Sequence, residues 1–117
     1  MTATLPTVLN RSGQTFTLAM DPGLTAFQGH FPGHPILPGV VQVDWAIRFG
    51  AEAFGPLGGF RALEHLKFLD PIRPGEPVEL QLGYDPGSGR LSFQYRAGSV
   101  RKSSGVILFA RRGEAAP

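Results

Sequence analysis

One helical segment among several strand-like segments is the feature that most restricts the fold of this chain. From Val40 to Phe54, apolar side chains recur at helical spacing and cover most of the circumference of the predicted helix. Its polar positions are Gln42, Arg48 and Glu52. A helix that is apolar on most sides is buried on most sides, so the rest of the chain has to supply a layer that covers it. Gly55-Pro56 then ends the helix.

The strand-like segments alternate apolar and polar residues, and turn signals separate them. They predict strands over residues 14–20, 60–69, 78–84, 90–97 and 104–111. Turns rich in proline and glycine lie at Asp70-Pro71, at Pro74-Gly75 and in the hairpin loop 85–89. One strand, one long helix and about four further strands in antiparallel order predict an α+β fold, in which a curved sheet of about five strands wraps the helix. We expect a single domain over residues 1–117, with 113–117 frayed.

Composition excludes several classes of protein. The chain has 117 residues, of which 42% are hydrophobic and 17% charged, and it contains no cysteine, so disulfides and thiolate chemistry are excluded. No apolar run approaches the roughly 20 residues of a membrane-spanning helix. Residues 1–11 lack the apolar stretch of a signal peptide, so we expect a cytoplasmic location. The net charge of +2 is too small to indicate nucleic-acid binding.

A stiff loop precedes the helix and contains two histidines, His30 and His34. Between residues 27 and 39, three prolines fix the backbone φ angle and three glycines permit close backbone approaches. A loop that delivers a histidine and a helix that delivers Asp44 can together form an acid/base pair. Taken alone, a histidine in such a loop is more often structural. A metal site formed by the two histidines is a weak alternative, because no third ligand stands out nearby.

The loop and the first turns of the helix resemble a known family motif. Residues 30–39 read His-Phe-Pro-Gly-His-Pro-Ile-Leu-Pro-Gly. This is similar to the His-Phe-x-Gly-x-Pro-x-x-Pro-Gly signature of the 3-hydroxyacyl-[acyl-carrier-protein] dehydratases of fatty-acid synthesis. Asp44 lies 14 positions after His30, which is the family's spacing, and stands where many members carry Glu and some carry Asp. The continuation 41–46 is more similar to the aryl-polyene-type subgroup, and residues 66–75 resemble the family's second strand and turn.

The resemblance implies the hot-dog fold, in which a long central helix lies in a curved antiparallel sheet. It also implies a dimer in which His30 of one subunit faces Asp44 of the other. Dehydration of a 3-hydroxyacyl thioester needs a base for the C2 proton, which suits His30, and an acid for the departing C3 hydroxyl, which suits Asp44. We expect the apolar neighbours of Asp44 to raise the pKa of its carboxyl by desolvation, so that it stays partly protonated.

Further site residues follow from the same motif. Backbone N–H groups at Gly39 or Val40, at the electropositive start of the helix, are expected to polarise the thioester carbonyl. The motif adds Phe31 and Gly33 as substrate-binding residues. The family chemistry requires no metal and no organic cofactor, because the substrate arrives on a phosphopantetheine arm.

A basic stretch late in the chain is a candidate contact for an acidic acyl carrier protein. It comprises Arg96, Arg101 and Lys102, which are otherwise expected to be solvated. We expect a homodimer formed by edge-to-edge pairing of the sheets, and no nucleic-acid or membrane partner.

Two other functions are alternatives. A hot-dog acyl thioesterase would use an acid to activate water and would not need the His-Phe-Pro-Gly loop. A non-catalytic partner subunit of a dehydratase heterodimer would tolerate the loss of His30 or Asp44, and this chain keeps both. Asp44 itself has a structural alternative, as the ion-pair partner of Arg48 four residues later on a solvated helix face.

Overall fold

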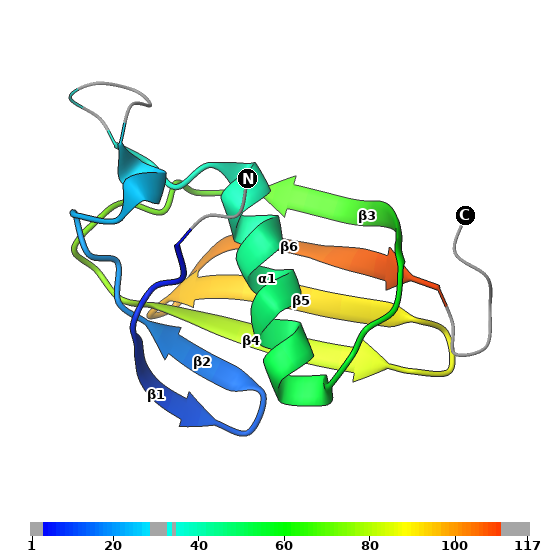
Figure 1. Ribbon diagram of the computed structural model, residues 1–117. Helices are drawn as coiled ribbons and strands as arrows, with labels where there is room; N and C mark the ends of the chain where they lie inside the picture. Colours follow the sequence, from blue (N-terminus) through cyan, green and yellow to red (C-terminus); the bar gives the residue numbers. More distant parts are fainter. Residues whose placement is uncertain (1–3, 29–32, 34, 111–117) are drawn as a thin grey trace.

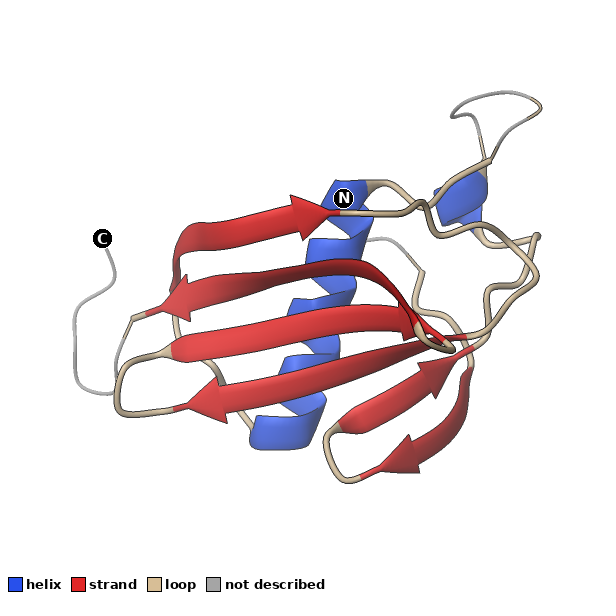
Figure 2. Ribbon diagram, turned by 180° about the vertical axis from the view of Figure 1, so that it is seen from behind, coloured by secondary structure: helices blue, strands red, loops and turns tan. Residues whose placement is uncertain are grey.

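The computed structural model describes residues 4–28, 33 and 35–110. In this part of the chain, one α-helix lies across one face of a six-stranded antiparallel sheet (Figure 1). Figure 2 shows the sheet from the opposite side, with the helix behind it. The strands follow the order β1-β2-β4-β5-β6-β3 across the sheet. The elements are β1 (Val8–Ser12), β2 (Thr15–Leu18), the 3-10 helix η1 (Thr25–Phe27), α1 (Gly39–Phe54), β3 (Phe60–Phe68), β4 (Val78–Asp85), β5 (Arg90–Ala97) and β6 (Val100–Phe109).

The ends of α1 are set by a proline and a glycine. Pro38 precedes the first helical residue with a φ of −61°, which is the angle that its ring favours. Gly55 follows the last residue with a φ of 85°, and its N–H donates to the carbonyl of Ala51 at 2.9 Å. Because this positive φ favours glycine, Gly55 ends the helix, and the predicted helix is confirmed within one residue. Across the described residues, no helix combines the length and apolarity needed to cross a membrane.

The sheet has six strands in place of the predicted five or so, because the sequence pattern did not reveal β1. All five residues of β1 are exposed, so it lacks the alternation that marks a half-buried strand. β6 also begins earlier than predicted, at Val100 in place of Ser104. Its first residues pair with β5, and Arg101 lies opposite Arg96. Because Arg101 and Lys102 are charged, the start of β6 lacks the apolar alternation that predicts a strand, although its backbone pairs with β5.

The core lies between α1 and the centre of the sheet. Trp45 and Phe49 are almost wholly buried, and the Phe49 ring centroid lies 5.0 Å from that of Phe16 on β2. An added Cβ at Gly50 would lie 2.9 Å from the Cδ2 atom of Leu91 on β5, so glycine permits this close approach. Burial of each large apolar side chain contributes about 1.5–3 kcal/mol to stability. This packing fixes the position of the helix over the sheet.

Two expectations about the surface of α1 were wrong. The helix was predicted to be buried on most sides, but Val40 is 77% exposed and Val43 and Ile47 are only half-buried in the single chain. Gln42 was predicted as one of the polar surface positions, but it is only 4% exposed. The polar side chain of Gln42 therefore lies within the helix–sheet interface, where it needs hydrogen-bond partners.

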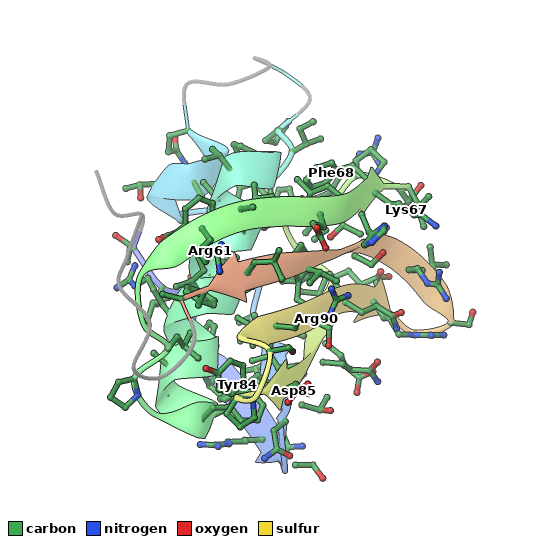
Figure 3. All side chains as sticks on the ribbon, turned by 90° about the vertical axis from the view of Figure 1, so that its right-hand side faces the viewer. Arg61, Lys67, Phe68, Tyr84, Asp85 and Arg90 are labelled. Carbon is green, nitrogen blue, oxygen red and sulfur yellow. The ribbon has the colours of Figure 1, made fainter. Side chains whose placement is uncertain are left out.

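β3 forms one edge of the sheet and carries apolar side chains at the surface. Figure 3 shows β3 from this side, with Arg61 near its start and Phe68 at its end. Phe60, Leu63 and Phe68 are exposed by 52%, 40% and 52%. An edge strand also presents unpaired backbone groups along one side. Exposed apolar side chains on an open strand edge are typical of a surface that pairs with another subunit.

Candidate active site

A cavity of about 570 Å³ lies between the start of α1 and the end of β3. Most of the side chains that line it are apolar, and Phe68 contributes an aromatic ring from the last position of β3 (Figure 3). Gln42 and Asp70 add polar groups. The full lining comprises Ile36, Leu37, Pro38, Gly39, Gln42, Phe68, Leu69, Asp70 and Pro71. An apolar cavity with a few polar groups is typical of a site for a small organic ligand.

The N-terminus of α1 opens onto this cavity. The N–H groups of Val41 and Gln42 both donate to the carbonyl of Pro38 at 3.1 Å. The earlier amides of Gly39 and Val40 belong to the first turn, where a helix has no internal acceptor for them. An added Cβ at Gly39 would lie 2.8 Å from Cζ of Phe68, so glycine lets the aromatic ring lie against the helix start. Of the two predicted donors, Gly39 lines the cavity and Val40 follows it in the first turn of α1, and their contact with a thioester stays a prediction.

Asp44 lies one turn further along α1. Its Oδ2 atom is 3.6 Å from Nη1 of Arg48, and both side chains are 34% exposed. Oδ2 is itself buried and accepts no hydrogen bond within the described part of the chain. The ion pair with Arg48, which was the structural alternative, is therefore present. The carboxyl is half-buried, however, and not on a fully solvated face.

Tyr95 of β5 adds a polar group that the sequence pattern did not single out. Its hydroxyl donates to the main-chain carbonyl of Gln42 at 2.7 Å. Burial raises the pKa of Tyr95 well above its ordinary value, and the nearby charge of Asp44 raises this pKa further. Tyr95 therefore remains a hydrogen-bond donor at physiological pH. The only sequence signal at this position was the period-2 alternation of a strand, which does not separate a structural tyrosine from a site residue.

Two of the predicted site residues, His30 and Phe31, lie outside the described residues, so the pairing of His30 with Asp44 stays a prediction. His34, the other histidine of the loop, also lies outside them. Gly33 is described, and it is an exposed turn residue with a φ of 83°. The third histidine, His65 on β3, has a side chain that is 72% exposed.

The predicted carrier-binding residues differ in their surroundings. Lys102 is largely buried, since its side chain is 13% exposed and its Nζ atom lies 2.5 Å from Oδ2 of Asp70. Asp70 lines the cavity, so this pair places Lys102 beside the cavity wall. Arg101 is exposed, and Arg96 donates to the carbonyl of Ser99 at 3.3 Å. Lys102 therefore forms an ion pair within the chain. Arg96 and Arg101, in contrast, lie opposite each other at the β5–β6 hairpin.

Comparison with known proteins shows to which family this chain belongs. The family model ApeI-like, described as ApeI dehydratase, matches residues 8–106. The chain belongs to the ApeI-like dehydratase family. A chain of the dehydratase heterocomplex ApeI:P from Xenorhabdus doucetiae superposes on this ApeI-like protein with a TM-score of 0.82 and 31% sequence identity. The match covers 90% of this chain and 97% of the other, and it confirms the predicted hot-dog fold.

Curated relatives of this ApeI-like protein include 3-hydroxyacyl-[acyl-carrier-protein] dehydratases named FabZ. The FabZ of Roseiflexus sp. is 35% identical over 98 residues, which are 75% of this chain and 68% of that protein. The FabZ of Roseiflexus castenholzii is 36% identical over 66 residues, or 50% of this chain and 46% of the relative. The match thus spans about half the length of some of these relatives. The predicted dehydratase family, nearest the aryl-polyene type, is confirmed.

Proposed function

We propose that this protein is a dehydratase that converts a carrier-bound 3-hydroxyacyl thioester to the trans-2-enoyl thioester. The observation that carries the proposal is the apolar cavity at the open N-terminus of α1, one helical turn before Asp44. In this arrangement an acyl chain can lie against apolar side chains while its thioester reaches helix amides. Membership of the ApeI-like family supports the same chemistry.

We assign the two proton transfers of the elimination to two side chains, His30 and Asp44. Neutral His30 takes the proton from C2, and its unperturbed pKa of about 6.5 leaves it neutral at pH 7. Asp44 gives a proton to the departing C3 hydroxyl, which leaves as water, and the double bond forms between C2 and C3. The amides of Gly39 and Val40 stabilise the charge on the thioester oxygen. This route uses no metal and no organic cofactor beyond the phosphopantetheine arm of the carrier.

A small substrate tests the proposal without any carrier protein. The purified protein is incubated with a 3-hydroxyacyl pantetheine thioester, and the absorbance of an enoyl thioester is followed with time. A dehydratase produces this absorbance and a product that is lighter by one water. A thioesterase, the second candidate function, would instead release free thiol without any enoyl signal.

We propose that the active unit is a dimer of hot-dog subunits that pair through β3. The exposed apolar side chains on the open edge of β3 support this assignment. A homodimer would place two copies of β3 side by side across a two-fold axis. A heterodimer with a related subunit is the alternative, since the matched ApeI:P structure is a heterocomplex.

The substitution Leu63→Glu is expected to convert the dimer to monomers and to abolish most activity, because it introduces a charge into the pairing edge. Sedimentation velocity measures the assembly. Leu9→Glu is a matched control, since Leu9 is exposed on β1 at the opposite edge of the sheet and this variant should remain dimeric. A fully active monomer of the unmodified protein at micromolar concentration would rule out a dimer in which each active site combines residues from both subunits.

Charge reversal at the β5–β6 hairpin tests the proposed carrier contact. Arg101→Glu is expected to lower kcat/KM for a carrier-bound substrate on the order of tenfold at low salt, because the carrier is acidic and long-range attraction is lost. Turnover of a pantetheine thioester should change little. Arg11→Glu, on the exposed strand β1, is the control. An equal loss on both substrates would show that Arg101 acts on the site and not on the carrier.

A further inference from the structure

The side chain of Gln42 is buried with both of its polar atoms bonded. Its Nε2 group donates to the carbonyl of Leu37 at 3.1 Å, and its Oε1 atom accepts from Oγ of Ser103 at 2.5 Å. Ser103 is fully buried on β6, and Gln42 also lines the cavity. A carboxamide donates through its NH₂ group and accepts through its oxygen at the same time, without any change of protonation.

These bonds connect elements that are distant in the sequence. Leu37 is the last buried residue of the loop before α1, and its own N–H donates to the carbonyl of Ile72 at 2.8 Å. The main-chain carbonyl of Gln42 accepts the bond from Tyr95 of β5. Gln42 thus joins the end of the loop to the first turn of α1 and joins that turn to β5 and β6.

Building on the dehydratase function proposed above, we propose that Gln42 is a positioning residue that holds Leu37, at the end of the loop, and the Asp44 turn of α1 in one fixed relation. The loop that carries His30 leads directly to Leu37, and Asp44 lies two residues after Gln42. A displacement of about 1 Å between reacting groups can reduce a rate about 10²-fold. The hydrogen bond from Gln42 to Leu37 restrains this displacement at the point where the loop enters the helix.

Core packing alone does not require an amide at this position. The neighbouring buried positions of the same helix face, Ala46 and Phe49, are apolar. An apolar residue at position 42 would fill a similar space but would leave the carbonyl of Leu37 and the hydroxyl of Ser103 without partners. The amide therefore serves the geometry of the loop and helix at the cavity.

The substitution Gln42→Glu separates positioning from packing, because it keeps the shape of the side chain and replaces the NH₂ donor by a carboxyl oxygen that can ionise. An ionised carboxylate can accept from Ser103 but cannot donate to Leu37, whereas a protonated carboxyl can do both. We expect kcat on a pantetheine thioester to fall by about 10- to 100-fold at pH 8, with KM changed less than about twofold. As the pH falls within the folded range, the ratio of variant to wild-type kcat should rise toward one.

Gln94→Glu is the matched control, since Gln94 bonds Gln81 at 3.1 Å in an exposed pair. Its kcat ratio should stay near one at every pH. Circular dichroism and sedimentation establish that each variant is folded and assembled like the wild type. Hydrogen exchange at the amide of Leu37 provides a readout besides activity, and it should be faster in Gln42→Glu at pH 8 than in the wild type.

Ser103→Ala is the second variant, for use if Gln42→Glu does not fold. It removes one hydroxyl and leaves the bond to Leu37, so a smaller loss of kcat, about 3- to 10-fold, is expected with KM unchanged. A folded Gln42→Glu variant, or failing that Ser103→Ala, with wild-type kcat would overturn the positioning role. A wild-type protein that forms no enoyl product would contradict the proposed function instead, so the two failures are distinguishable.

Discussion

Replacing His30 by alanine is expected to lower kcat for dehydration by about 10²- to 10⁴-fold, because the variant lacks the proposed base for the C2 proton. KM for a pantetheine thioester should change little, since the cavity lining at the start of α1 is untouched. The measurement is steady-state enoyl formation by His30→Ala and wild type at pH 7. A loss in kcat with an unchanged KM identifies a group that acts in the transition state.

His34→Ala is the matched control for this experiment. His34 lies in the same loop, four residues later, at a variable position of the motif. It should retain near wild-type kcat, and both variants should show the same thermal unfolding midpoint. If His34→Ala lost as much activity as His30→Ala, the loop as a whole and not one base would be responsible. A His30→Ala variant with near wild-type activity would contradict the assigned role.

Replacing Asp44 by asparagine is expected to produce a comparable loss of kcat, about 10²-fold or more, while substrate still binds. Asparagine keeps the shape and can hydrogen-bond, but it cannot pass a proton to the leaving hydroxyl. The ion pair with Arg48 is also lost, but both side chains are 34% exposed. Such pairs contribute only about 0.3–0.5 kcal/mol, so the fold should remain. Equilibrium binding of the substrate and single-turnover kinetics measure the two effects separately.

Two further experiments test the role of Asp44. Asp44→Glu should keep partial activity, because related dehydratases carry either acid at this position.

Mixing inactive His30→Ala and Asp44→Asn chains should restore roughly a quarter of wild-type activity if each site combines residues from both subunits of a two-fold dimer. No recovery after confirmed subunit exchange would place both residues of a site in one chain. Near wild-type kcat for Asp44→Asn alone would remove Asp44 from the mechanism.

The helix and most of the sheet could be predicted from the sequence, because their side chains follow the periods of half-buried elements. Leu91, Phe93 and Tyr95 alternate with polar residues, and β5 has the predicted bounds. Pro38 and Gly55 set the ends of α1 through their own backbone preferences. β1 could not be predicted in this way, because a fully exposed edge strand is held by backbone bonds that leave no pattern of burial.

The site was predictable in part. The positions of Gly39 and Val40 at a helix start followed from the proline and glycine before the apolar segment. The burial of Gln42 was missed because its polar side chain suggested the solvated face. Helical spacing, however, places it four residues before Ala46 and seven before Phe49, on the buried face. Tyr95 and the ion pair of Lys102 with Asp70 depend on contacts between distant segments, which no local pattern encodes.

Mass analysis of an intact acyl carrier protein tests the dehydratase assignment most directly. The carrier is loaded with a 3-hydroxyacyl group, incubated with wild type, His30→Ala or Asp44→Asn, and weighed. Wild type is expected to yield a carrier lighter by one water, with the enoyl thioester still attached, whereas both variants should leave the substrate unchanged. Release of free carrier thiol and free acid at a rate that depends on Asp44, without any enoyl-carrier product, would contradict the dehydratase assignment and favour a thioesterase.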